Sequence, residues 1–260
     1  ESVPVALTWT ERKAQLLGDL GADVVIAYPT DRAILSLTAG DFFHEIIVGR
    51  LQAKAMVEGP NFFFGRGRQG TIDTLRQLCQ AAAMELEVVA PLQINDRYVS
   101  SSWIRQLILA GQIAEADRLL TQPYRVHGHV IRGAGRGATL GFPTANLDPV
   151  GMVLPPVGVY AGRAEIDGAG AVEQAGKESI ATASSRVYPA AIHIGPNLTF
   201  DEQQVKFEVH MVGCQQVLYG RLLELDFLDR LRDIRPFENV EALRQQEMSD
   251  VQTVTEIVRL

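Results

Sequence analysis

The segment GHVIRGAGRGATLGFPTAN, residues 128–146, joins a glycine loop to a rigid polar tripeptide. Glycine lets the backbone adopt φ > 0 and approach a ligand closely, so the N–H groups around Gly133, Gly135 and Gly137 can converge on phosphate oxygens. Arg136 adds a positive charge to the same loop. The segment predicts a phosphate cradle, although a glycine-rich hairpin followed by a polar strand explains the loop chemistry equally well.

Two oxygen-bearing side chains follow this loop. Pro143 fixes the backbone just before Thr144 and Asn146, and these two side chains point to the same side if the segment is extended. Hydroxyl and amide oxygens are hard ligands. The pair therefore predicts a site for Mg²⁺ that carries a nucleotide.

The segment resembles the signature of riboflavin kinases, in which a glycine loop precedes Leu-Gly-Phe-Pro-Thr-Ala-Asn, here at 140–146. Residues 158–162 resemble that family's Gly-Val-Tyr strand, and residues 205–210 resemble its Val-Glu-x-His strand. The resemblance covers about residues 123–250. It implies a barrel domain that transfers the γ-phosphoryl group of ATP to riboflavin to give FMN.

A kinase that phosphorylates a primary alcohol needs a base for the hydroxyl group. The resemblance implies that this base is Glu208, which on an alternating strand points away from its apolar neighbours Phe207 and Val209. Spacing alone is more typical of an exposed strand carboxylate. The resemblance also implies that Arg232 and Phe237 enclose the isoalloxazine ring, and a surface arginine with a core aromatic explains this pair nearly as well.

The preceding half resembles the partner domain of bacterial bifunctional riboflavin kinase/FMN adenylyltransferases. Residues 57–70 resemble that family's Gly-x-Asn-Phe-x-Phe-Gly loop, and residues 98–105 resemble its Val-Ser-Ser-Thr-x-Ile-Arg segment. A helix start with hydroxyls and a guanidinium suits phosphate groups. The residues that this reading assigns to nucleotide binding are Asn61, Ser101, Ser102 and Arg105.

Both motifs of this half also have structural explanations. The serines at 100–102 alone are more typical of an N-cap than of a phosphate site. The aromatic residues at 62–64 suit either a hydrophobic core or a wall for flavin or adenine.

Members of the bifunctional family begin with a strand and a Gly-x-Phe-Asp-x-x-His-x-Gly-His loop that holds the nucleotide triphosphate. The sequence opens at Glu1-Ser2-Val3, downstream of the place of that loop. The fold class that we expect is therefore α/β plus β. An incomplete Rossmann-like nucleotidyltransferase domain at residues 1–122 precedes a small antiparallel riboflavin kinase β-barrel with a C-terminal helix at residues 123–260. We expect FMN from riboflavin and ATP, but little or no FAD from FMN and ATP.

Two other functions fit the same residues. One is a flavin-binding regulatory module without catalysis, and the other is a nucleotidyltransferase that acts on a different small phosphorylated substrate. Riboflavin binding without ADP release would favour the first of these.

Composition limits the partners. The 260 residues are 47% hydrophobic and 21% charged, which is typical of a globular protein. A net charge of −7 disfavours a nucleic-acid partner, since phosphate-backbone binding needs a basic face. Two cysteines are too few for a disulfide framework, and no apolar stretch approaches the ~20 residues that span a membrane. We therefore expect a cytoplasmic protein without a membrane partner; the oligomeric state stays open.

Hydrophobic periodicity places the elements along the chain. The first half alternates helix and strand as in a parallel sheet, with predicted helices at 11–20, 41–48, 71–83 and 102–120 and predicted strands at 24–27, 53–58 and 86–89. Possible capping boxes begin at Thr8 and Thr38. Short β-rich runs after 123 predict an antiparallel barrel, an inserted loop falls at 168–185, and a helix is expected at 239–258.

Overall fold

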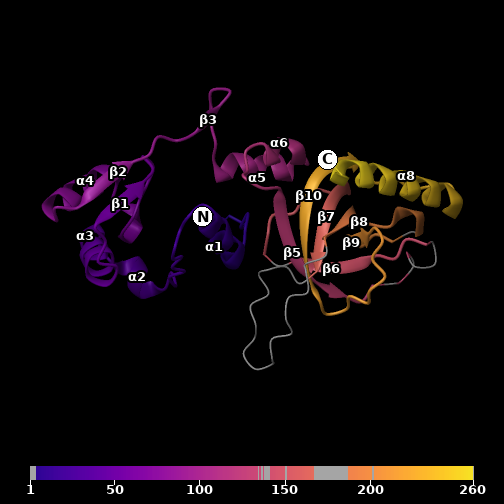
Figure 1. Ribbon diagram of the computed structural model, residues 1–260, viewed down its shortest axis with the longest axis horizontal. Helices are drawn as coiled ribbons and strands as arrows, with labels where there is room; N and C mark the ends of the chain where they lie inside the picture. The colour runs from indigo at the N-terminus through magenta and orange to yellow at the C-terminus, as the bar shows by residue number, and fades with distance from the viewer. Residues whose placement is uncertain are drawn as a thin grey trace. The chain divides into compact units, whose positions relative to one another are not determined.

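The computed structural model describes residues 4–133, 135, 137, 141–149, 151–166, 187–200 and 202–259 (Figure 1). The chain forms two compact units. One is Val24–Val99, and the other combines Glu1–Asp23 with Ser100–Leu260. Arg136 and the predicted loop at 168–185 lie outside the described residues.

A closed antiparallel barrel of six strands forms the centre of the larger unit, in the order β10-β5-β6-β9-β8-β7 (Figure 1). The strands are β5 (Tyr124–Ile131), β6 (Ala145–Pro149), β7 (Gly158–Ile166), β8 (Val187–Gly195), β9 (Lys206–Met211) and β10 (Leu222–Arg232). The barrel confirms the fold predicted for this half. Successive side chains alternate between the barrel interior and its outer face.

The barrel interior is filled by large apolar side chains. Phe227 meets the edge of Tyr160 at a ring-centroid distance of 5.5 Å, and both residues are fully buried. Tyr219, by contrast, is 58% exposed and lies under the Arg132 guanidinium. Tyr219 precedes β10, so the strand alternation that buries Tyr160 does not apply to it.

Helix α8 (Val240–Arg259) packs against β7 and β8, as expected for the C-terminal helix (Figure 1). The Asn239 side chain caps its start by accepting the Ala242 N–H at 2.9 Å. Arg232 at the end of β10 donates from Nη2 and Nε to Asp250 Oδ2, at 2.7 and 2.9 Å. This paired contact fastens α8 to the barrel.

Three further helices belong to the same unit as the barrel: α1 (Thr10–Asp19), α5 (Ser101–Leu109) and α6 (Ile113–Asp117). Helix α6 packs on β10 and β5, and α1 is held by the stacking of Trp9 on His127. The predicted capping box at Thr8 is wrong, because α1 begins after Trp9 and has no side-chain cap. The predicted domain boundary after residue 122 stays a prediction.

The smaller unit contains a two-stranded parallel sheet, β1 (Ala55–Glu58) and β2 (Glu85–Val88). Its remaining elements are α2 (Arg32–Ser36), α3 (Ala39–Asp41), the π-helix η1 (Phe42–Arg50), the 3₁₀ helix η2 (Arg66–Arg68), α4 (Ile72–Ala81), and the hairpin β3 (Gln93–Ile94) with β4 (Arg97–Tyr98). Thr38 accepts the Asp41 N–H, so the second capping prediction is confirmed. The strand predicted at 24–27 is wrong: these residues are exposed and pair with no strand among the described residues.

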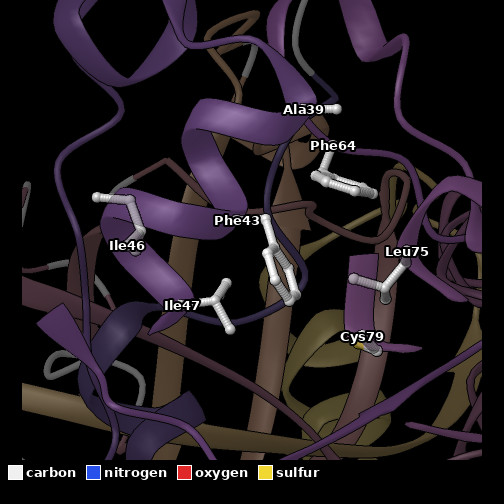
Figure 2. Close-up of a cluster of buried hydrophobic side chains, with 7 residues drawn as sticks. All are labelled: Ala39, Phe43, Ile46, Ile47, Phe64, Leu75 and Cys79. Atoms are coloured by element: carbon white, nitrogen blue, oxygen red, sulfur yellow. The ribbon is translucent and has the colours of Figure 1, made fainter. Parts of the chain in front are cut away.

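Figure 2 shows the core of the smaller unit, in which Phe43 points toward Leu75 and Cys79 of α4. Phe64 is buried in this cluster and stacks on Phe62 at 5.3 Å. Phe63 is 45% exposed and lies under Arg68. Of the two explanations for residues 62–64, the core therefore holds for Phe64 and not for Phe63. In the described part of the chain, no helix is both long and apolar enough to cross a membrane.

Phe43→Ala should destabilise the smaller unit by about 3–5 kcal/mol, because it opens a cavity in a well-packed cluster. Hydrogen-exchange mass spectrometry on peptides from β1 and α4 measures this loss of protection. Phe63→Ala is the matched control at an exposed ring and should leave protection unchanged. Equal effects of the two substitutions would contradict the assignment of the core.

Candidate active site

One row of side chains crosses the outer face of the barrel at a single level. Asn146 on β6 is the cross-strand partner of Glu208 on β9, and Glu208 is the partner of His193 on β8. The row continues through Val159 on β7 to Arg232 on β10. Directly opposed side chains on one sheet face lie about 4.5–5.5 Å apart at Cβ, so the barrel brings three separately predicted site residues into one row.

Helix α8 and the segment between β8 and β9 cover part of this face and leave a pocket. Its walls include four predicted residues: Thr144, Glu208, Arg232 and Phe237. The structure thus brings together the predicted base, one predicted metal ligand and both predicted flavin contacts. These residues are far apart in the sequence, and the pairing of the barrel strands brings them close together.

Glu208 is half-buried between the apolar residues Phe207 and Val209, which point into the barrel. The Asn197 amide donates a hydrogen bond of 3.2 Å to Glu208 Oε2. This bond orients one carboxylate oxygen. Burial lowers the pKa of the opposite His193, which favours the neutral imidazole, while the charge of Glu208 acts against this shift.

A second pocket begins on the other side of Thr144. Thr144 and Gly135 line it together with apolar side chains that include Val130, Val217 and Tyr219. Because Thr144 belongs to both pockets, a group bound in one would meet a group bound in the other at this residue.

The glycine loop lies close to Asn146. A Cβ atom at Gly133 would fall 2.1 Å from Asn146 Nδ2, and one at Gly137 would fall 2.4 Å from the Phe142 carbonyl oxygen. Gly135 has φ = +70°, in the left-handed region that favours glycine. Three predicted cradle positions therefore need glycine for packing or for backbone conformation.

The flavin-side pair is ordered by neighbouring charges. Asp250 holds the Arg232 guanidinium, whose central carbon also lies 5.7 Å from the centre of the Phe237 ring. Arg235 approaches the same ring at 5.2 Å. The three residues form one cationic and aromatic wall of the first pocket. His210, also in that pocket, contacts the Pro143 carbonyl oxygen at 2.9 Å through Nδ1.

The other predicted nucleotide contacts are distributed over both units. Ser100 is the N-cap of α5 and accepts the Trp103 N–H, so the expected capping role is seen there. Ser101 and Ser102 are exposed in the first turn of α5, and Arg105 donates to the Val5 carbonyl at 3.0 Å. Asn61 is exposed in the smaller unit.

Several pocket residues were not predicted, among them His193, Asn197 and Glu247. His193 had a signal, because a lone polar residue alternates with Ile192 and Ile194 in an apolar strand. Glu247 had none, since it stands in a helix rich in charged and amide side chains.

Comparisons with known proteins cover both halves. The family model for riboflavin kinase matches residues 120–258, and the model for FAD synthetase matches residues 1–103. The bifunctional riboflavin kinase/FMN adenylyltransferase of Bacillus subtilis (strain 168) is 32% identical over 253 residues, 95% of this chain and 73% of that protein. Its namesake from Escherichia coli (strain K12) is 28% identical and covers 100% of this chain and 78% of that protein. A crystal structure described as a macrolide-efflux protein from Streptococcus pneumoniae has a TM-score of 0.79 at 30% identity, over 96% of this chain and 75% of that one.

Gly133→Ala should weaken the binding of Mg-ATP at least about tenfold, equivalent to about 1.4 kcal/mol, because the new methyl group displaces the Asn146 amide. Calorimetric titration with Mg-ATP measures the change. Gly18→Ala is the control, since a Cβ there meets nothing within 4 Å. Unchanged affinity in the Gly133 variant would show that Asn146 does not take part in nucleotide binding.

Proposed function

The chain belongs to the family of bifunctional riboflavin kinase/FMN adenylyltransferases, and we propose that its barrel phosphorylates riboflavin with Glu208 as the general base. The observation that carries this assignment of residues is the row Asn146, Glu208 and His193. Glu208 and His193 line a pocket that shares Thr144 with a second pocket. The substrates are ATP and riboflavin, and the product is FMN.

The chemistry requires a base next to the attacking hydroxyl. The primary hydroxyl oxygen of the ribityl chain attacks the γ-phosphorus of ATP, and the bond from that phosphorus to the β,γ-bridging oxygen breaks to release ADP. The hydroxyl proton passes to Glu208, whose second oxygen accepts from Asn197. The carboxylate is thereby held in one orientation during proton transfer.

The two pockets divide the substrates. Riboflavin occupies the pocket of Glu208, with Arg232 and Phe237 beside the ring. The nucleotide occupies the pocket of Gly135 and Tyr219, with its phosphates toward Thr144. Each molecule then presents its reacting end at the residue that both pockets share.

Mg²⁺ fits this junction. Thr144 and Asn146 would hold it through a hydroxyl and an amide oxygen, and Gly133 leaves the room that the Asn146 amide needs. In the described part of the chain no three His, Cys, Asp or Glu side chains form a metal cluster, so the phosphate oxygens would complete the coordination. When bound, the ion neutralises phosphate charge.

Against the expectation of little or no FAD, we propose that the first half carries the second activity of the family, the adenylylation of FMN to FAD, because the FAD synthetase model and the bifunctional relatives match it. For that reaction we assign nucleotide binding to the start of α5, and Asn61 of the smaller unit stays a separate prediction. Ser101 and Ser102 offer hydroxyls and backbone N–H groups at a helix N-terminus, which favours phosphate. Arg105 supplies a cation in the next turn.

Chromatographic separation of flavins after incubation with Mg-ATP and riboflavin tests the function. FMN with stoichiometric ADP supports the kinase. Bound riboflavin without ADP would instead indicate the regulatory module, and a different adenylylated product would indicate the other nucleotidyltransferase. The same chromatogram shows whether FAD is formed, which tests the adenylyltransferase activity of the first half.

Glu208→Gln should lower kcat by about 10²-fold or more while the affinities for ATP and riboflavin stay close to those of the wild type, because the amide keeps the shape but cannot take the proton. Steady-state kinetics and equilibrium binding measure the two effects. Glu238→Gln, at an exposed carboxylate, is the control. Turnover like that of the wild type would end the assignment of the base.

Asn146→Ala should raise the Mg²⁺ and ATP concentrations needed for half-maximal turnover together, because one ligand of the shared ion is lost. Titrations of ATP binding with and without Mg²⁺ measure this coupling. An equal loss of ATP affinity in the absence of the metal would instead place Asn146 in direct contact with the nucleotide.

A further inference from the structure

Two polar atoms in the pocket of Glu208 are buried without a hydrogen-bond partner among the described residues. They are Nε2 of His193 on β8 and Oε2 of Glu247 on α8. The other buried unpaired side-chain atoms in the described part belong to Arg163 and Arg230, which do not line this pocket. A buried unpaired atom costs about 1–3 kcal/mol, so two in one pocket indicate a ligand that supplies their partners.

Glu247 has the chemistry to accept or to donate. Burial raises its pKa to about 7, the neighbouring carboxylates of Asp250 and Glu208 act in the same direction, and Arg232 acts against them. The carboxyl group therefore exists in both protonation states near neutral pH. The Arg232 guanidinium donates hydrogen bonds to Asp250. Its positive charge therefore acts on Glu247 through space, without a hydrogen bond between the two side chains.

The position of Glu247 indicates which part of the ligand it meets. Glu247 lines the pocket together with Arg232 and Phe237, the predicted flavin contacts, whereas Glu208 on the barrel face stands at the reacting hydroxyl in the proposed function. The reacting hydroxyl and the isoalloxazine ring are the two ends of the riboflavin molecule. The ring carries one N–H flanked by two carbonyl oxygens, and a carboxyl group complements this donor and acceptor pattern.

We propose that Glu247 is a specificity-determining residue that hydrogen-bonds the N3–H and carbonyl edge of the flavin ring, and that His193 bonds the ribityl chain. The assignment rests on the proposed kinase function. His193 lies directly opposite Glu208 in the strand register, which places it nearer the reacting end than the ring.

The test compares riboflavin with N3-methylriboflavin, which lacks the N–H. Dissociation constants are measured by flavin fluorescence without ATP, together with kcat and KM. The wild type should bind riboflavin about tenfold more tightly than the methylated analogue, the equivalent of one charge-assisted hydrogen bond. Glu247→Leu should bind both alike, and Glu247→Gln should keep part of the preference. His193→Leu should weaken both flavins equally.

Measurements of thermal stability distinguish a role of Glu247 in ligand binding from a structural role. Removing an unpaired buried polar atom should leave the melting temperature of Glu247→Leu unchanged or raise it. Glu241→Leu, at an exposed site on the same helix, should match the wild type in both flavin affinities. The Gln variant decides the result if the Leu variant does not fold.

Three outcomes would overturn the proposal. A Leu variant with the preference of the wild type removes Glu247 from ring recognition, and a lower melting temperature with the preference intact shows a structural role. FMN formation by the wild type leaves the kinase function standing in both cases. Failure of the wild type to form FMN would overturn the kinase function and this assignment with it.

Discussion

The candidate site depends on the buried contact between Arg232 and Asp250. Arg232 ends the last barrel strand and Asp250 stands in the middle of the last helix, so the pair joins two elements that both line the pocket. Arg232 donates from Nη2 to Asp250 Oδ2 and from Nε to both carboxylate oxygens, and these contacts fix orientation as well as separation. Loss of one partner from such a buried pair costs about 3–5 kcal/mol, because the other charge is left uncompensated.

The same contact shapes the charge of the pocket. Asp250 takes up the hydrogen-bonding capacity of Arg232 on one side, while the guanidinium still faces the Phe237 ring. Burial raises the pKa of Glu247, the carboxylate of Asp250 adds to this shift, and Arg232 opposes it. A flavin ring entering the pocket thus meets a cation and an aromatic ring beside a carboxyl group that can change its proton content.

Alternation along strands made much of the barrel predictable. Phe207, Glu208 and Val209 read as inside, outside and inside from sequence alone, and the register then aligns Asn146 with Glu208. What sequence lacks is the choice of neighbours. Residues 24–27 have the apolar character of a strand, but no described strand pairs with them. Tyr219 is an aromatic residue of a kind common in cores, but it precedes the start of β10.

Glu247 escaped prediction because its proposed role depends on an unmet hydrogen bond. Arg163 and Arg230 each have one unpaired buried nitrogen, but their other nitrogens bind Asp226 and Asp233 at 3.0 and 2.7 Å, so the cost is offset within the fold. Glu247 makes no ion pair among the described residues, so nothing within the fold offsets the free-energy cost of burying its unpaired oxygen. An unpaired atom of this kind is favourable only when a molecule bound in the pocket supplies its hydrogen-bond partner. Since the missing partner belongs to another molecule, no pattern in this sequence can display it.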